Sequence, residues 1–310
     1  MTAGGKARHA ARLVNTAAAC YFYRGMNDTA LVRRRGSGAF SSRDYIRRRF
    51  RDIPTRLNEN GVDQFGFDPE FAAKAGPYMG WVYENYFRVE QHGVDNVPDG
   101  RCLLISNHSG QLPFDAGMIT MAVFLERTKP RICRAMIEKF VTDLPFVSYF
   151  MERCGQLIGT PDNCRRVLEA EEAILVFPEG VRGINKLFHE RYQLKNFGLG
   201  FMRLALETKT PILPVGVIGA EEQAPSLANL KKVAKLFGLP ALPITPTLLL
   251  GPLGLLPLPT KYRIYFGEPM MFDGDPNDED EAIEQKVQQV KGAVKQLLER
   301  GLRERKHIFW

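Results

Sequence analysis

The chain has 310 residues, enough for one large domain or two smaller ones, and its apolar fraction of 45% is ordinary for a folded protein. Five scattered cysteines without a CxxC pair argue against a zinc site or a disulfide framework, and for a reducing, cytoplasmic environment. The net charge of +7 is unevenly distributed, because residues 1–56 contain twelve Arg and one Lys but only three Asp. This basic N-terminal arm suits an anionic partner, either a membrane surface or a nucleic acid, and a solvated arm is an equal alternative.

The N-terminal residues lack the long apolar core of a cleavable signal, although an amphipathic helix is expected around residues 8–21. The most apolar stretch, residues 239–259, contains six prolines and is therefore not a regular membrane-spanning helix. We expect a protein without a transmembrane helix, with the arm at 1–56 followed by a single domain at 57–310.

Seven short apolar segments predict strands, and helical patterns such as 163–172 and 200–209 separate several of them. The strand segments are 86–94, 102–106, 134–138, 155–159, 173–177, 212–218 and 262–267. A last helix begins in the acidic run 273–284, has an apolar stripe from Ile283 to Leu297, and is expected to stop at Gly301. The alternation indicates an α/β fold, in which a mostly parallel sheet of about seven strands is flanked by helices.

The first candidate motif is ISNHSGQLPFD, residues 105–115. His108 follows a buried strand and Asp115 suits the start of the next helix, so both are expected at the ligand-binding edge of the sheet. An imidazole beside a carboxylate can remove a proton from a hydroxyl near neutral pH. Taken alone, the motif fits a loop histidine followed by a helix-capping aspartate better than it fits a catalytic pair.

The second motif is AILVFPEGVRG, residues 173–183. Gly180 allows close approach of the backbone, and Arg182 offers a fork of donors to a phosphate. In most proteins such a segment is a turn with a surface charge.

In this order the two motifs resemble the glycerolipid acyltransferase family, which includes 1-acylglycerol-3-phosphate acyltransferases and belongs to the lysophospholipid acyltransferase superfamily. The resemblance covers most of the chain beyond residue 80 and includes the later Pro211 and Pro214. It implies an acyltransferase-like sandwich that moves a fatty acyl group from acyl-CoA or an acyl-carrier protein to a hydroxyl, without a metal or prosthetic group.

The resemblance also implies roles for individual residues. His108 would be the general base and Asp115 would orient it, while Asn107, Glu179, Gly180 and Arg182 would bind the acceptor.

The sequence departs from the family pattern in two places. Six residues separate His108 from Asp115, where the family usually has four. Thr160 and Pro161 stand where a basic residue commonly binds phosphate, and Arg165 and Arg166 come a turn later. The acceptor could therefore be a lysophospholipid with a larger head or a neutral alcohol such as diacylglycerol, and a catalytically silent lipid-binding protein remains an alternative.

Contact with membrane lipids is expected through residues 226–238, which read as a basic amphipathic helix, and through the apolar segment 239–259 that follows. Both could instead cover the core. The sequence contains no motif for nucleic-acid binding beyond the arginines of the arm, and it carries no signal for an oligomeric state.

Overall fold

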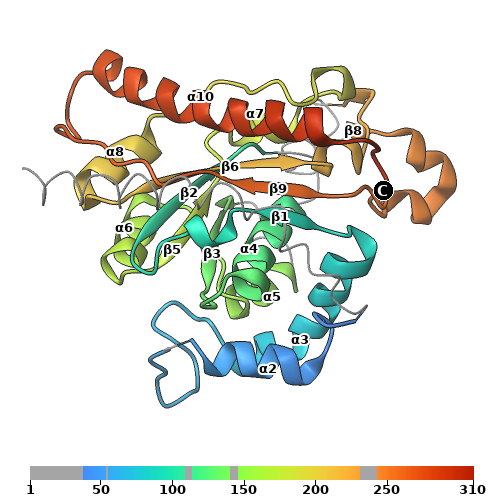
Figure 1. Cartoon of the computed structure of the whole chain (residues 1–310), viewed down its shortest axis with the longest axis horizontal. Coiled ribbons are helices and arrows are strands. Elements are labelled where there is room, and N and C mark those ends of the chain that lie inside the picture. The colour runs from blue at the N-terminus through green and yellow to red at the C-terminus, as the bar shows by residue number, and fades with distance from the viewer. Residues whose placement is uncertain (1–37, 54, 109–113, 140–145, 231–242) are drawn as a thin grey trace, which may run out of the picture. The chain divides into compact units, whose positions relative to one another are not determined.

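The computed structural model describes residues 38–53, 55–108, 114–139, 146–230 and 243–310. Residue contacts divide the chain into two units, Met1–Ala39 and Phe40–Trp310. The second unit contains every helix and strand described below (Figure 1). The helix expected around residues 8–21 lies outside the described residues.

All seven predicted strands are present in one sheet, whose order is β1-β9-β6-β2-β5-β3-β4. Every neighbouring pair in this sheet is parallel except β6 and β9, so the prediction of a mostly parallel sheet is confirmed. The strands are β1 (Glu90–His92), β2 (Cys102–Ser106), β3 (Cys133–Ile137), β4 (Leu157–Ile158), β5 (Ala173–Val176), β6 (Ile212–Ile218) and β9 (Arg263–Phe266).

Helices cover both faces of this sheet, and the strand sequences explain why. Successive residues of β2 alternate between two buried clusters, since Leu104 packs on one face and Leu103 and Ile105 pack on the other. A central strand that is buried on both faces is expected to be apolar along nearly all of its length, as residues 102–105 of β2 are.

On the Leu104 face lie α2 (Arg43–Arg51) and α4 (Phe114–Glu126), and α3 (Pro69–Trp81) packs against α2. On the other face lie α6 (Pro161–Glu169), α8 (Gly200–Thr208) and α10 (Asp280–Glu304). In Figure 1, α10 and α8 lie on one side of the sheet, and α4 and α2 lie on the other.

The last part of the expected basic arm belongs to this compact unit. Phe40 and Ile46 are buried in the same cluster as Tyr83. Arg49 donates hydrogen bonds to the carbonyl oxygens of Phe124 and Arg127, at 2.7 and 2.6 Å, and thereby satisfies the C-terminal end of α4. The compact unit therefore begins at Phe40 and not at residue 57.

The apolar stripe predicted for α10 is present, but the helix does not stop at Gly301. It continues to Glu304, and Gly301 is buried within it. A Cβ atom at Gly301 would come within 2.3 Å of Ile218 Cδ1 and 2.6 Å of a ring carbon of Tyr265. Glycine is required here because the helix crosses the sheet at close range.

The expected helix at 226–238 is wrong at its start, because Ala228–Asn229 form the short strand β7, paired antiparallel with β8 (Pro243–Ile244). Residues 231–242 lie outside the described residues. Beyond β8 comes a 3₁₀ segment, η6 (Pro246–Leu255), which is interrupted by non-helical backbone at Gly251. Within the described ranges, no helix combines the length and the apolar character that crossing a membrane requires.

Candidate active site

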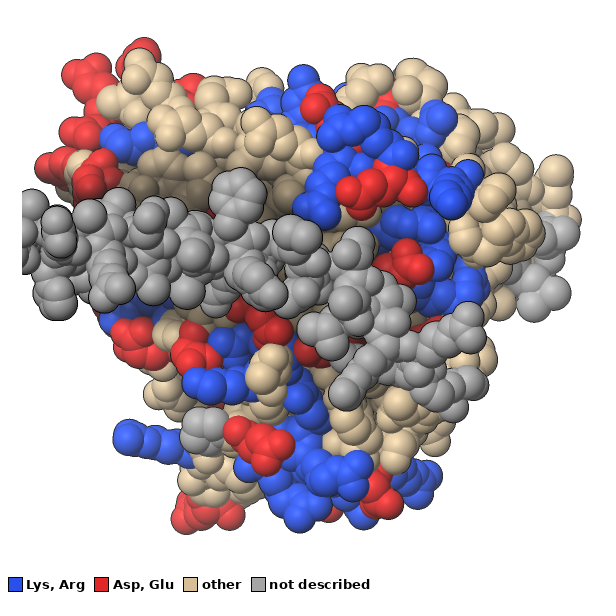
Figure 2. Space-filling view, viewed as in Figure 1, with Lys and Arg blue, Asp and Glu red and all other residues tan. Residues whose placement is uncertain are grey.

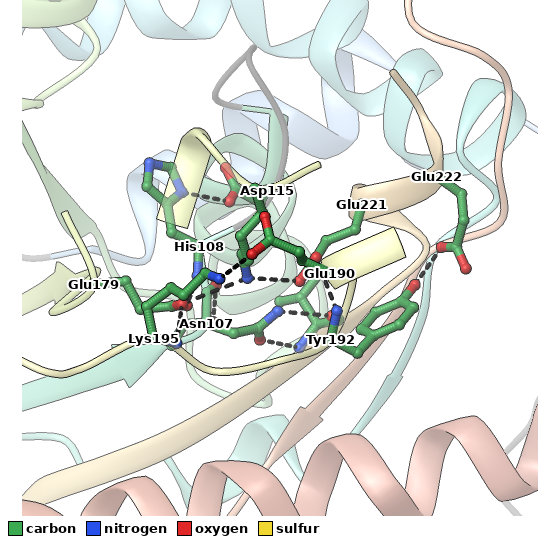
Figure 3. Close-up of polar contacts among 12 residues, drawn as sticks. Asn107, His108, Asp115, Glu179, Glu190, Tyr192, Lys195, Glu221 and Glu222 are labelled. Atoms are coloured by element: carbon green, nitrogen blue, oxygen red, sulfur yellow. Dashed lines mark hydrogen bonds and ion pairs between the residues drawn. The ribbon is translucent and has the colours of Figure 1, made fainter. Parts of the chain in front are cut away.

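His108 and Asp115 form the centre of the candidate site at the carboxyl end of β2. His108 follows the strand by two residues, and Asp115 lies in the first turn of α4 with a fully buried side chain. The Nδ1 atom of His108 lies 2.7 Å from Oδ2 of Asp115 (Figure 3). The predicted contact is therefore present although six residues separate the pair.

This contact determines which nitrogen of His108 can act as a base. A carboxylate can only accept, so in the neutral imidazole Nδ1 carries the proton and Nε2 keeps its lone pair. The other carboxylate oxygen of Asp115 accepts the backbone N–H of Ala116 at 2.8 Å. Phe177 stacks on the imidazole, with ring centroids 4.2 Å apart and planes inclined by 20°. The orientation of the ring is thus held by the ends of two strands and the start of a helix.

Asn107 positions His108 from within the sheet. Its side-chain amide donates to the carbonyl of Val217 at 3.1 Å, and its side-chain oxygen accepts the Val217 N–H at 2.8 Å. The side chain thereby replaces the next pair of ladder hydrogen bonds between β2 and β6, and it is fully buried. The main chain is consequently free to turn at His108 without leaving Val217 unsatisfied.

Glu179, from the second motif, also lies beneath His108. One carboxylate oxygen accepts the backbone N–H of His108 at 3.0 Å, and the other accepts the backbone N–H of Lys195 at 2.8 Å. The residue is only 1% exposed. Glu179 and Asn107 were expected to bind the acceptor, but both side chains are engaged with the protein's own backbone.

The remaining residues of the second motif form a close turn beside His108. Gly180 has a positive φ of 54°, and the short helix α7 (Val181–Ile184) follows. A Cβ atom at Gly183 would come within 2.8 Å of the Cβ of His108 and 3.0 Å of that of Glu179. Arg182 is exposed on this helix and is the residue of the motif whose charge faces solvent.

A group of buried charges continues from Glu179, and it was missed in the sequence. The ammonium of Lys186 lies 3.4 Å from Glu179 and 3.0 Å from Glu221, and all three side chains are at most 4% exposed. Glu221 and Glu222 lie in the 3₁₀ segment η5 (Ala220–Glu222), directly after β6. A strand end followed by two glutamates is a signal of the same kind as the one that identified His108.

Burial raises the pKa of Glu221 to about 7, and the nearby charge of Lys186 opposes this shift. The adjacent Tyr192 donates its hydroxyl proton to Glu222 and accepts the N–H of Gly219 at 2.8 Å. Burial, followed by the charge of Glu222, raises the pKa of Tyr192 well above its ordinary value. Figure 3 shows the hydroxyl of Tyr192 directed at Glu222.

The two arginines considered for phosphate binding have different surroundings. Arg165 contacts both carboxylate oxygens of Glu207, at 2.8 and 3.1 Å, and also binds Asp162. Arg166 lies over the ring of Phe65. Among the residues that the structure describes, no three His, Cys, Asp or Glu side chains are grouped as a metal site.

A cavity of about 980 Å³ lies at the amino ends of the strands and not beside His108. Its lining includes Arg127, Arg131, Arg134 and Glu172. These charges bind one another or backbone carbonyls, as Arg134 does with Glu172 and Arg131 with Gly100. Because its lining contains neither His108 nor Asp115, the cavity is separate from the candidate site.

Comparisons with known proteins agree with these motifs. A family model described as Acyltransferase matches residues 88–218. An uncharacterized protein of Mycobacterium bovis is 42% identical over 256 residues, which are 80% of this chain and 72% of that protein. A Gallus gallus protein described as a DGAT1/2-independent enzyme synthesizing storage lipids is 31% identical over 196 residues, or 63% of this chain and 54% of that protein.

Among solved structures, the 1-acyl-sn-glycerophosphate (LPA) acyltransferase PlsC from Thermotoga maritima matches with a TM-score of 0.46 and 16% identity, over 77% of this chain and 80% of that one. The family match spans β2, β5 and β6 and both motifs. The Acyltransferase match at residues 88–218 makes the chain an acyltransferase, and it belongs to the same family as the uncharacterized protein of Mycobacterium bovis.

Proposed function

We propose that this protein moves a fatty acyl group from an acyl thioester, acyl-CoA or acyl-carrier protein, to the hydroxyl of a lysophospholipid or another glycerolipid acceptor at a membrane surface. The observation that carries the proposal is the contact of 2.7 Å between His108 and a fully buried Asp115. The imidazole remains 17% exposed, so a substrate hydroxyl can reach it.

In the proposed reaction, Nε2 of His108 accepts the proton of the acceptor hydroxyl, and the oxygen attacks the thioester carbonyl. The carbon–sulfur bond breaks, and the leaving thiolate takes the proton from the imidazolium. Asp115 stabilises the imidazolium while it exists. The products are an ester and a free thiol, and the residues require no metal or prosthetic group for this sequence of steps.

The binding roles expected for Asn107 and for the second motif are modified in this proposal. Glu179 and Asn107 position the backbone of His108, because their buried side chains are already bound to backbone groups. Arg182, exposed beside the turn at Gly183, is the candidate for a polar or charged head group. Gly180 permits close approach of the acceptor through its left-handed backbone.

A neutral acceptor such as diacylglycerol is the second candidate. Thr160 stands where a basic residue commonly binds phosphate, and it carries no charge. Its hydroxyl caps α6 by accepting the backbone N–H of Asn163. Arg165 is bound to Glu207 and Asp162. The name of the Gallus gallus relative refers to storage lipids, which favours the same alternative.

An exposed apolar surface supports action at a membrane. Leu249 of η6 and Leu256, which follows η6, are 91% and 60% exposed, and Tyr78 and Trp81 of α3 are exposed as well. The two elements are linked, because Tyr86 donates to the carbonyl of Pro257 at 2.5 Å and its ring lies 6.4 Å from that of Trp81. Aromatic and leucine side chains of this kind suit the lipid interface.

The first experiment is a thioester-release assay of the purified protein against a panel of acceptors, including lysophosphatidic acid, other lysophospholipids and diacylglycerol. His108→Ala should lower acyl transfer by about two to four orders of magnitude, because it removes the general base. Turnover of the variant at the wild-type rate would overturn the proposed chemistry. Arg182→Ala should weaken binding of a charged acceptor and have little effect on a neutral one.

Vesicle co-sedimentation tests the membrane surface and the basic arm separately. The paired change Trp81→Ser and Leu256→Ser should weaken binding in a salt-resistant way, whereas the exposed Leu57→Ser serves as the matched control. Removal of residues 1–37 should weaken binding to anionic vesicles at low salt. The truncation stops before Phe40, because Phe40 and Ile46 are part of the core.

A further inference from the structure

We infer that Lys186, held in place by Glu221, is a positioning residue for His108: its ammonium holds the carboxylate of Glu179 in the form and place that His108 requires. The inference rests on the proposed function, in which His108 is the general base. It assigns a task to two buried charges, Lys186 and Glu221, that the proposed chemistry does not otherwise use.

The contacts form one continuous line from His108 to Glu221 in η5. The backbone N–H of His108 donates to Glu179, whose second oxygen is 3.4 Å from the ammonium of Lys186. The same ammonium donates to Glu221 at 3.0 Å. The second oxygen of Glu221 accepts the backbone N–H of Tyr192 at 2.9 Å. Each carboxylate thus binds a backbone amide and shares the one ammonium.

The charge balance makes this arrangement sensitive to the loss of the Lys186 ammonium. Two carboxylates and one ammonium lie in a region with almost no exposure to solvent. Burial of an unpaired carboxylate is costly, so removal of the ammonium favours protonation of Glu179 and Glu221. A protonated Glu179 is a weaker acceptor for the N–H of His108. The position of the general base then depends on pH.

Other titratable and charged groups face this line from the neighbouring elements. Glu222 binds Arg305, which follows α10, and Tyr192 contacts both Glu221 and Glu222.

Near Glu179, Lys195 binds Glu190 with its ammonium at 2.6 Å and reaches Glu179 only through its backbone N–H. Burial, followed by the charge of Asp115, raises the pKa of Tyr262. Lys186 is therefore the cation shared by Glu179 and Glu221.

The test compares the pH dependence of kcat for two variants that change the balance in opposite directions. In Lys186→Met the two carboxylates lose the ammonium, so the acid limb of the profile should move to higher pH. At neutral pH its kcat should fall by about tenfold to a hundredfold, as for a misplaced catalytic group, with little change in the KM of the acyl donor. In Glu221→Gln the ammonium serves Glu179 alone, so the acid limb should stay in place or move to lower pH.

Three further proteins make the result decisive. Lys186→Arg keeps the cation and should restore the wild-type profile, whereas Lys129→Met removes an exposed, paired ammonium at the other edge of the sheet and serves as the matched control. The double variant Lys186→Met with Glu221→Gln removes one charge of each sign and should recover part of the lost kcat. Circular dichroism and thermal melting show which variants fold, and Glu221→Gln tests the inference by itself if Lys186→Met does not.

A folded Lys186→Met protein whose profile is only scaled down, without a shift in pH, would show a structural role and overturn the inference. Wild-type kcat in this variant, or an upward shift in Glu221→Gln, would do the same. His108→Ala in the same assay distinguishes a failure of the proposed function from a failure of the positioning role of Lys186. If it retains activity, the proposed function fails; if it is inactive while the Lys186 variants keep the wild-type profile, only the positioning role fails.

Discussion

Replacement of Asp115 by Asn should abolish most turnover while changing the shape of the site very little. The buried Asp115 uses one oxygen for the N–H of Ala116 and the other for Nδ1 of His108. Asn has one oxygen and one NH₂ group, so it cannot accept from both. If the oxygen stays with Ala116, the NH₂ group faces Nδ1, which must then give up its proton to become an acceptor.

The proton consequently moves to Nε2, the atom that has to accept the proton of the substrate. A wrong tautomer of this kind costs about 10⁴-fold in kcat in a comparable His–Asp pair. This corresponds to about 5 kcal/mol of transition-state stabilisation at 1.36 kcal/mol for each factor of ten. The expected loss for Asp115→Asn is therefore about 10³-fold to 10⁴-fold, measured as thiol release from acyl-CoA at saturating acceptor.

A double-variant cycle supplies the control. Asp115 acts only through His108 in this scheme, so Asp115→Asn combined with His108→Ala should be no slower than His108→Ala alone. Thermal melting of Asp115→Asn should remain close to that of the wild type, because the packing volume is unchanged. Turnover of Asp115→Asn within about tenfold of the wild type would refute the tautomer argument and leave the carboxylate a capping role only.

Three other changes are expected to have measurable effects. Asn107→Ala should lower the free energy of unfolding in urea by about 2–4 kcal/mol, because both backbone groups of Val217 lose buried partners; a loss below about 1 kcal/mol would contradict the ladder role. Gly183→Ala should reduce kcat, since the new Cβ would come 2.8 Å from that of His108, and an unchanged kcat would show that the turn can relax. Burial raises the pKa of Glu221 from an ordinary 4.5 to about 7, so its contribution to stability is full below about pH 4.5 and is lost as the pH rises through 7. The wild type should therefore lose about 3 kcal/mol more than Glu221→Gln between pH 4.5 and 8, and equal losses in urea titrations would contradict this sign.

Local sequence patterns were sufficient for the strands and for the class of fold. Strands buried on both faces, such as β2 and β6, are short uninterrupted apolar runs, and the predicted ranges 102–106 and 212–218 match the observed ones. The prediction of strands and helices was less accurate for two apolar segments that contain only short or irregular elements. Residues 86–94 contain only the three-residue strand β1, preceded by a π-helical turn, and residues 228–229 form a strand instead of a helix.

Contacts between segments that are distant in the sequence could not be predicted from local sequence patterns. Gly301 has the local character of a helix stop, but it lies inside α10 because the helix passes close to Ile218 and Tyr265. Phe40 and Ile46 lie in an arginine-rich stretch that suggested a solvated arm, yet both are buried. In each case the deciding neighbour is far away in the sequence.

The sequence by itself determined that His108 and Asp115 lie at one edge of a parallel sheet, because His108 has a strand-end context and Asp115 a helix-start context. Only the tertiary structure decided that the wider loop still allows a contact of 2.7 Å, because this distance depends on where α4 packs on the sheet. It also decided that Asn107 and Glu179 support His108 from below, since their partners are backbone groups of β6 and of residues near 195. Hydrogen bonds to the backbone leave no trace in the identity of the partner residue, and so the sequence could not reveal them.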